Sequence, residues 1–223
     1  QVGLTELMRA KPDGYTIGYA GVPTTTISYL DPERKTLYNR KSFQKIATHF
    51  TLPHIIAVRA ESPFKTLKDL IDAAKAKPEG IKFGDNGFMG VTHLGGMLFE
   101  KAANIRFAFV HFDGDAPTTN ALLGGHVDAT CLSMGALLSH IKTGGVRPLG
   151  VMDSQESPFL PGVKTLVSQG YDVMSRTVMG ISAPAGTPAG VLAILADTIK
   201  KAQDDSGHQQ KMTALGFTLI YVS

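Results

Sequence analysis

Three evenly spaced glycines precede a helix-like segment in GDNGFMGVTHLGG, residues 84–96. Gly84, Gly87 and Gly90 do not match the dinucleotide fingerprint, whose glycines are two and then three apart, and no Lys-Ser or Lys-Thr closes a phosphate loop. Glycines let a backbone approach a ligand closely, and the helix start that follows at Thr92 and His93 offers N–H groups and a positive dipole end. This combination predicts a site for a small anion.

A second group of chemically capable residues lies in HFDGDAP, residues 111–117. His111, Asp113 and Asp115 occupy alternate positions, and an extended segment points alternate side chains the same way, as a metal site would require. No fourth ligand is identifiable, however, and Asp115 ahead of Ala-Pro is expected to be the N-cap of a helix that runs to Leu123. We therefore predict no metal and no cofactor.

Enzymatic motifs are absent from the sequence. It contains no G-x-S-x-G elbow, no H-E-x-x-H and no Cys-His pair at a defined spacing, so no catalytic residues are predicted and the chain is not expected to be an enzyme. Its one cysteine, Cys131, lies in the apolar run 127–132 and is predicted to be a small buried hydrophobe.

Composition limits the class of protein further. The chain has 223 residues, of which 43% are hydrophobic and 18% charged, as is usual for a globular protein. Its net charge of +3 comes without a basic cluster interleaved with aromatics, which argues against nucleic acid as a partner. No apolar run is long enough to span a bilayer, so membrane insertion is not expected. The chain begins with Gln and with no signal segment, which indicates a processed or truncated form.

Strand-like and helix-like segments alternate along the chain, which predicts an α/β fold. Thr66 and Asp69 form a capping box before one helix, and Thr187-Pro188 opens another. The strands are predicted at 15–20, 45–58, 81–84, 106–112, 127–132, 147–152, 172–183 and 217–222.

The strands at 45–58 and 172–183 are unusually long, as expected where a chain crosses twice between two lobes. We predict a ligand cleft between the lobes. Lobe 1 comprises residues 1–60 and 177–223, and lobe 2 comprises residues 61–176.

Six motifs occur in an order that resembles one family. They are KPDGYTIGYAG at 11–21, SPFKTLKDLIDAAKAKPEGIKFG at 62–84, THLGGMLFEKAANI at 92–105, ALLGGHVDA at 121–129, LPGVKTL at 160–166 and APAGTP at 183–188. Together they resemble the Bug-type solute-binding proteins of tripartite tricarboxylate transporters.

The resemblance implies a periplasmic receptor of the type II, two-lobed Venus flytrap fold. Such a receptor takes a small organic carboxylate between its lobes and delivers it to the membrane permease subunits of the transporter. We expect a monomer. Two other classes stay open. One is an effector-binding domain of a regulator, whose expected helix-turn-helix signature this chain lacks, and the other is a small-molecule enzyme.

Family members begin with a strand, a glycine-rich loop and a helix ahead of the KPDGYT-like motif. About fifty such residues, judged from typical lobe size, have no counterpart here. The C-terminal helix that normally follows the last strand is also missing after Ser223. Lobe 1 is therefore expected to be incomplete.

The resemblance assigns ligand-binding roles to loops of both lobes. In lobe 1 the loop falls on Thr24, Thr25 and Thr26, whose hydroxyls can hold a carboxylate without a buried cation. The alternative is that these threonines only cap a helix start.

In lobe 2 the family's Gly/Ser/Asn-rich clamp matches residues 84–93. This match makes Asp85, Asn86, Gly87, Thr92 and His93 the candidates that would hold a carboxylate at a helix N-terminus. The alternative is that Thr92 merely caps the helix and His93 is solvated.

Three further candidates follow from the same comparison. Asp113 stands where the family usually has Lys or Arg, which predicts a ligand with one carboxylate and an amine or hydroxyl at its other end, unless Asp113 points to solvent. Ser133 matches a loop that faces the cleft and is a candidate donor. Arg176, near the hinge, either meets a carboxylate or is solvated.

Overall fold

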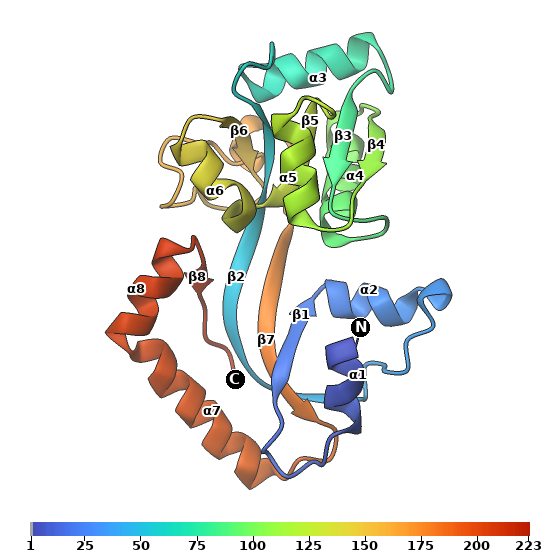
Figure 1. Ribbon diagram of the computed structural model, residues 1–223. Coiled ribbons are helices and arrows are strands. Elements are labelled where there is room, and N and C mark those ends of the chain that lie inside the picture. The colour runs from blue at the N-terminus through green and yellow to red at the C-terminus, as the bar shows by residue number, and fades with distance from the viewer. Residues whose placement is uncertain (1) are drawn as a thin grey trace. The chain divides into compact units, whose positions relative to one another are not determined.

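The computed structural model describes residues 2–223 and divides them into two compact units (Figure 1). Unit 2 is the continuous segment Leu52–Arg176, whereas unit 1 ends at Thr51 and resumes at Thr177. The chain thus passes between the units inside β2 (Phe43–Arg59) and at the first residue of β7 (Arg176–Pro184). The long strand expected at 45–58 is confirmed, and the strand expected at 172–183 begins later, at Arg176.

Unit 2 is built on a sheet in the order β6-β2-β5-β3-β4. Strand β2 runs antiparallel to its two neighbours, while β3 runs parallel to β4 and β5. The strands are β3 (Lys82–Asp85), β4 (Ala108–His111), β5 (Ala129–Ser133) and β6 (Val146–Val151). A mixed sheet with helices in the connections confirms the predicted α/β class.

Helices cover both faces of this sheet (Figure 1). Successive strand residues point to opposite faces, so Ile56 packs in the core beneath α3 and α4 while Ile55 packs in the core beneath α5 and α6. The helices are α3 (Leu67–Ala76), α4 (Val91–Ala103), α5 (Asp115–Leu123) and α6 (Met134–Lys142), and a short 3-10 helix, η2, spans Val167–Gln169.

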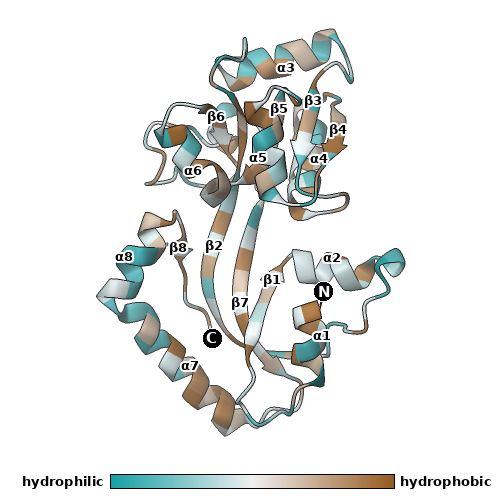
Figure 2. Cartoon of the chain, viewed as in Figure 1, coloured by the Kyte–Doolittle hydropathy of each residue, from teal (hydrophilic) through white to brown (hydrophobic). Residues whose placement is uncertain are grey.

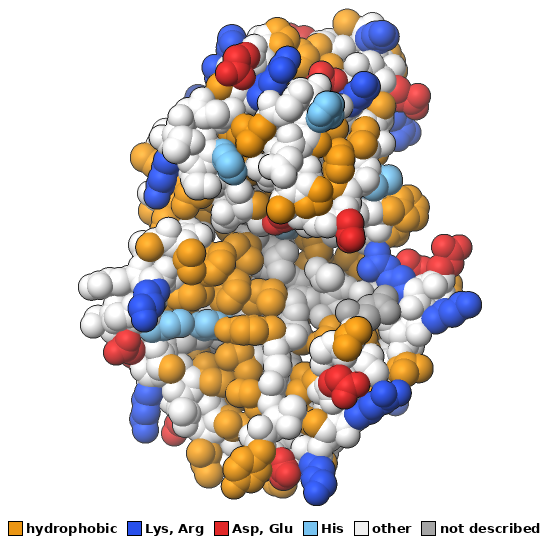
Figure 3. Space-filling model, viewed as in Figure 1, with side chains coloured by type: hydrophobic (Ala, Val, Ile, Leu, Met, Phe, Trp, Pro, Cys, Tyr) orange, Lys and Arg blue, Asp and Glu red, His pale blue; other side chains and the backbone are white. Residues whose placement is uncertain are grey.

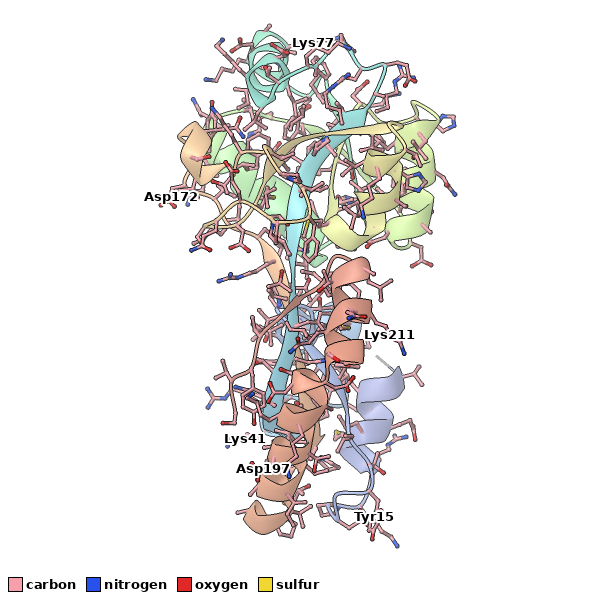
Figure 4. The ribbon with its side chains drawn as sticks, turned by 90° about the vertical axis from the view of Figure 1, so that its left-hand side faces the viewer. Tyr15, Lys41, Lys77, Asp172, Asp197 and Lys211 are labelled. Carbon is pink, nitrogen blue, oxygen red and sulfur yellow. The ribbon has the colours of Figure 1, made fainter. Side chains whose placement is uncertain are left out.

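The start of α3 has the predicted capping box. The Thr66 hydroxyl accepts from the Asp69 N–H, and the Asp69 carboxylate accepts from the Thr66 N–H. Lys77, just past the end of α3, and Asp172, in the segment that leads into β7, are exposed (Figure 4).

Unit 1 has a sheet in which β7 lies between β1 (Gly18–Val22) and β2, and β8 (Thr218–Leu219) pairs with β2. The strand expected at 15–20 starts only at Gly18. Of the strand expected at 217–222 only two residues form a ladder. The remainder follows β2 through single backbone bonds, such as that from Thr48 N–H to the Val222 carbonyl.

The helices of unit 1 are less buried. They are α1 (Val2–Arg9), α2 (Thr24–Leu30), the 3-10 helix η1 (Pro32–Arg34), α7 (Ala189–Asp204) and α8 (Ser206–Ala214). Helix α7 is hydrophobic over its first half and α8 is mainly hydrophilic (Figure 2). The apolar side chains along one side of α7, those of Leu192, Leu195, Ala196 and Ile199, are only half-buried. Gln203 is the one buried residue of this helix. Hydrophobic side chains accordingly gather on the face of unit 1 that Figure 3 shows.

None of the helices within residues 2–223 is both long enough and apolar enough to cross a membrane.

Candidate functional site

Three polar residues end three neighbouring strands of unit 2. Asp85, His111 and Ser133 are the last residues of β3, β4 and β5. Because these strands are parallel, their carboxyl ends meet at one edge of the sheet, the edge at which open α/β sheets usually bind ligands. The sequence predicted two of these residues as ligand contacts and considered the third, His111, only as a metal ligand.

A hydrogen-bond network joins the predicted residues Asn86, Thr92 and Ser133. The Asn86 N–H donates to Thr92 Oγ1 (3.0 Å), and the Thr92 hydroxyl donates back to Asn86 Oδ1 (2.6 Å). The Asn86 amide and the Ser133 hydroxyl then donate to the two oxygens of Asp115, at 2.7 and 2.8 Å. The network holds the glycine-rich loop against α4, α5 and β5.

The expected role of Asp115 as an N-cap is wrong. Gly114, with φ 108°, is the N-cap of α5, and Asp115 is the first residue of the helix. A carboxylate in the first turn still gains from the helix dipole. Its oxygens, however, accept hydrogen bonds from Asn86 and Ser133. These partners are distant in the sequence, so no local pattern could have predicted the bonds.

A second cluster, which we call the His93–His111 cluster, consists of Asp85, His93 and His111. The Asp85 carboxylate is fully buried and accepts from the Gly87 N–H (2.9 Å) and from His111 Nδ1 (2.9 Å). His93 Nδ1 accepts from the Met89 N–H at 3.0 Å. Burial lowers the pKa of His93, an effect that the Asp85 charge opposes in part.

The alternative reading of the α4 start is also wrong. The N-cap is Gly90, so Thr92 lies inside the helix, and His93 is 6% exposed rather than solvated. Gly90 is required by space, because a Cβ there would lie 2.8 Å from the Gly87 carbonyl oxygen. Gly87 is required by its φ of +145°, which side chains rarely adopt.

A buried histidine that the sequence did not single out lies behind the network. His54 on β2 is opposite Ser133 in the strand register, and its Nδ1 lies 2.8 Å from Ser175 Oγ. Burial lowers the pKa of His54 to about 4, although the Asp115 charge acts in the opposite direction. His54 is therefore neutral at neutral pH and serves as a polar support beneath the edge.

The other predicted residues of unit 2, Asp113 and Arg176, form no hydrogen bond with the described residues of these two groups. Asp113 is exposed, and among the described residues no hydrogen bond or ion pair involves it. Arg176 forms an ion pair with Asp153 at 3.1 Å, with its side chain 47% exposed. Their contact with a ligand stays a prediction.

The three threonines belong to unit 1, where they are the first residues of α2. Thr25 is buried and Thr24 is exposed. The N-cap is Pro23, and it makes no side-chain cap, so the alternative that these threonines cap the helix is wrong.

Cys131 is fully buried in the core beneath α3 and α4, and burial raises the pKa of its thiol. A thiol that resists ionisation is a poor nucleophile, so its prediction as a small core residue is confirmed.

Comparison with known families decides the class of this protein. The whole chain, residues 1–223, matches the model of the tripartite tricarboxylate transporter family receptor, TctC. The chain belongs to this family. It is a family of solute-binding receptors rather than enzymes, as the motifs predicted.

Individual relatives agree with this assignment. The UPF0065 protein in the gbd 5' region of Cupriavidus necator is 27% identical over 217 residues, which is 95% of this chain and 64% of that protein. BugT of Bordetella pertussis is 27% identical over 170 residues, which is 76% of this chain and 52% of that protein. This chain spans about three fifths of the length of three curated relatives of this kind.

Solved structures share the fold. The periplasmic binding protein BugD has 27% sequence identity and a TM-score of 0.84, over 98% of this chain and 73% of that one. MatC of Rhodopseudomonas palustris with bound malate has 23% identity and a TM-score of 0.83, over 98% of this chain and 74% of that one. Rpa4515 of R. palustris with adipate has 21% sequence identity and a TM-score of 0.85, over 98% of this chain and 73% of that one. The predicted fold, that of two-lobed periplasmic binding proteins, is confirmed.

Proposed function

We propose that this protein is the receptor that captures a small organic carboxylate for a tripartite tricarboxylate-type transporter. The observation that carries the proposal is the glycine-rich loop at the start of α4, held by the Asn86–Thr92–Asp115–Ser133 network in a chain of the receptor family. Structures of the same fold contain malate and adipate, which supports a carboxylate as the ligand class.

We further propose that the protein works in the periplasm and passes its ligand to membrane permease subunits. The similar protein BugD is described as a periplasmic binding protein, which supports this location, and the family description as a transporter receptor supports delivery to a permease. Delivery requires that the permease distinguish the liganded from the empty receptor, because a partner shifts an equilibrium only through differential affinity for its states.

The ligand contacts proposed in unit 2 are Asn86, Gly87, Thr92, His93 and Ser133, with Asp85 behind them. Since Asn86 and Thr92 bind each other, they shape the loop and leave its backbone to meet the ligand. Contacts from Thr24, Thr25 and Thr26 in unit 1 are proposed as a second group.

A thermal-shift screen tests the function. A ligand that binds only the folded state at a hundred times its dissociation constant adds about 2.7 kcal/mol of stability. Malate, adipate, succinate and small monocarboxylates should be screened against this protein. If no carboxylate moves its melting temperature, the proposal is wrong.

Asp113→Lys tests the predicted charge preference. If Asp113 faces the ligand, a dianion is repelled, since like charges 4 Å apart near a surface cost on the order of 4 kcal/mol before screening. The lysine variant should then gain affinity for succinate relative to a small amino acid in calorimetric titration. An unchanged ratio of the two affinities removes Asp113 from the site.

A further inference from the structure

A short chain of hydrogen bonds in unit 1 ends on two histidines. The Tyr19 hydroxyl on β1 lies 2.7 Å from His49 Nδ1 on β2, and His49 Nε2 lies 2.9 Å from His208 Nε2 on α8. The three side chains thus join the sheet of unit 1 to α8. None of them belongs to the proposed ligand contacts.

The two histidine rings point their Nε2 atoms at each other. Their planes differ by 14° and their centroids are 5.1 Å apart, while the two Nε2 atoms are 2.9 Å apart. Both nitrogens therefore lie between the centroids, as in an N–H···N hydrogen bond. A zinc ion on this line would need about 4 Å between the nitrogens. The contact therefore holds a proton rather than a metal.

The hydrogen bond between the rings exists in two charge states of the pair. When both rings are neutral, one Nε2 donates and the other accepts. One added proton is also accommodated, because an imidazolium at His208 donates to His49 Nε2 while His49 Nδ1–H donates to the Tyr19 oxygen. A second added proton leaves a hydrogen on both Nε2 atoms, which removes the acceptor and opposes two positive charges. The contact therefore withstands one charge but not two.

Burial makes His49 the ring that takes the second proton. It is 7% exposed and contacts the rings of Tyr19 and Phe50, whereas His208 is only partly buried. Burial lowers the pKa of His49, and the charge of His208 lowers it further. His49 is thus charged only at a pH below the ordinary histidine value of about 6.5.

Several other elements surround the pair. β1 contributes the Tyr19 hydroxyl, and burial raises its pKa, so it keeps its proton. β8 carries no titratable side chain, and neither does the part of β7 within unit 1. The charged residues of α7 and α8, with the N-cap between them, are Asp197, Lys200, Lys201, Asp204, Asp205 and Lys211. None of these charges shifts the pKa of His49, on which only burial and His208 act.

Helix α8 has few other attachments to the sheet. Among the described residues, no other hydrogen bond joins α8 to a strand of unit 1, and Met212 is the one buried residue of this helix. The neighbouring helix α7 is attached differently, because the Gln203 side-chain amide donates to the Thr48 carbonyl on β2 at 3.0 Å. An amide does not titrate, so acid acts on the attachment of α8 and not on that of α7.

We propose that the His49–His208 bond is a pH-sensitive switch, which holds α8 on the sheet of unit 1 and releases it when both rings are charged. The switch goes beyond the proposed receptor function and does not depend on a ligand. Its release loosens the chain from Ser206 onward, because α8 leads directly into β8, whose ladder with β2 has only two residue pairs (Figure 1).

Hydrogen exchange of backbone amides tests the proposal on this protein. Rates at pH 8, 6 and 4, each divided by the rate of an unstructured chain at the same pH, give the protection of α8. The reference is α7, which belongs to the same unit and is attached by an uncharged amide. Between pH 8 and pH 4 we expect α8 to lose roughly tenfold more protection than α7, as loss of one hydrogen bond does.

Two variants of His208 separate the hydrogen bond from the charge. His208→Gln keeps a side chain that donates and accepts but never becomes charged, so α8 should keep its protection relative to α7 at pH 4. His208→Phe keeps a ring without the bond, so α8 should be less protected already at pH 8 and should change little in acid. His126→Gln, at an exposed histidine of unit 2, is the control and should behave like the wild type.

Two results would overturn the proposal. One is a wild type in which α8 and α7 lose protection equally between pH 8 and pH 4. The other is a loss of α8 protection in acid that is as large in His208→Gln as in the wild type, because a second charge could not cause it. If His208→Phe does not fold, the comparison of the wild type with His208→Gln decides alone.

Discussion

The two units of this protein differ in how they bury apolar surface. Both hydrophobic core clusters, one on each face of the unit 2 sheet, consist entirely of residues from unit 2. In unit 1 the buried hydrophobic residues are few and scattered. They are Leu7, Tyr38, Ile46, Ala47, Phe50, Ala183 and Met212.

The exposed hydrophobic side chains show the same contrast between the units. Most of the large exposed hydrophobic residues belong to unit 1, among them Tyr15, Val22 and Ile194. Asp197 and Lys211 mark the exposed sides of α7 and α8, and the other sides of these helices are only partly covered (Figure 4). The difference teaches that hydrophobic burial stabilises unit 2 far more than unit 1, and that the glycine-rich loop is attached to the better-packed unit.

Removing a core ring should show the largest difference between the units. Phe83 is fully buried, and its ring stacks on Phe107 with centroids 4.4 Å apart. Phe83→Ala should cost about 3–5 kcal/mol of unfolding free energy in urea denaturation. Leu195→Ala, on the half-buried face of α7, should cost less than about 1 kcal/mol. Equal losses would contradict the contrast between the units.

The next largest effect should be the loss of stability in acid that the buried His54 of unit 2 causes. Its pKa in the folded protein is about 4, below the ordinary 6.5, so the unfolded chain takes up the proton first as the pH falls. The contribution of neutral His54 to the free energy of unfolding is therefore complete above pH 6.5 and is lost as the pH falls from 6.5 to about 4. The loss amounts to roughly 3 kcal/mol.

His49 of unit 1 is the matched comparison for this prediction. Its pKa is also lowered, by burial and then by His208, whose Nε2 lies 2.9 Å from His49 Nε2. Unfolding titrations from pH 8 to 4 should show a flatter pH dependence for His54→Gln than for His49→Gln. The reverse order would show that unit 1, rather than unit 2, holds the more strongly desolvated histidine.

The smallest effect should come from glycines in helices of the two units. In α4 a Cβ on Gly96 would lie 2.8 Å from the Phe109 ring, so Gly96→Ala should cost about 1–3 kcal/mol. In α7 a Cβ on Gly190 would meet nothing within 4 Å, so Gly190→Ala should stabilise by about 0.5–1 kcal/mol. Thermal unfolding should show a lower melting temperature for Gly96→Ala and a higher one for Gly190→Ala. A lower melting temperature for Gly190→Ala would mean that this face of α7 is covered.

The sequence predicted best what local patterns determine. The capping box at Thr66 and Asp69 and the long strand β2 are patterns of neighbouring residues, and both are confirmed. The strand at 217–222 failed because its apolar residues pair with β2 through single bonds, and pairing across the chain is not visible in a local pattern.

The site was predictable only in part for the same reason. The glycine spacing and the helix start pointed to the loop that Asn86 and Thr92 now organise. The partners that complete it, Asp115 and His111, come from elements that follow in the chain, and their roles depend on parallel strands ending together. Local capping rules predicted Asp115 as a helix N-cap, whereas it accepts hydrogen bonds from Asn86 and Ser133.

The pairing of β1 with β7 has a consequence for the order of folding during synthesis. Gly18 is opposite Ser182 in this ladder, so β1 has no β7 partner until the chain has been synthesised beyond residue 182. Unit 2 is one uninterrupted segment, Leu52–Arg176, and all of its strands are translated before that partner emerges. Because contacts distant in sequence form slowly, unit 2 is able to fold before the two segments of unit 1 pair.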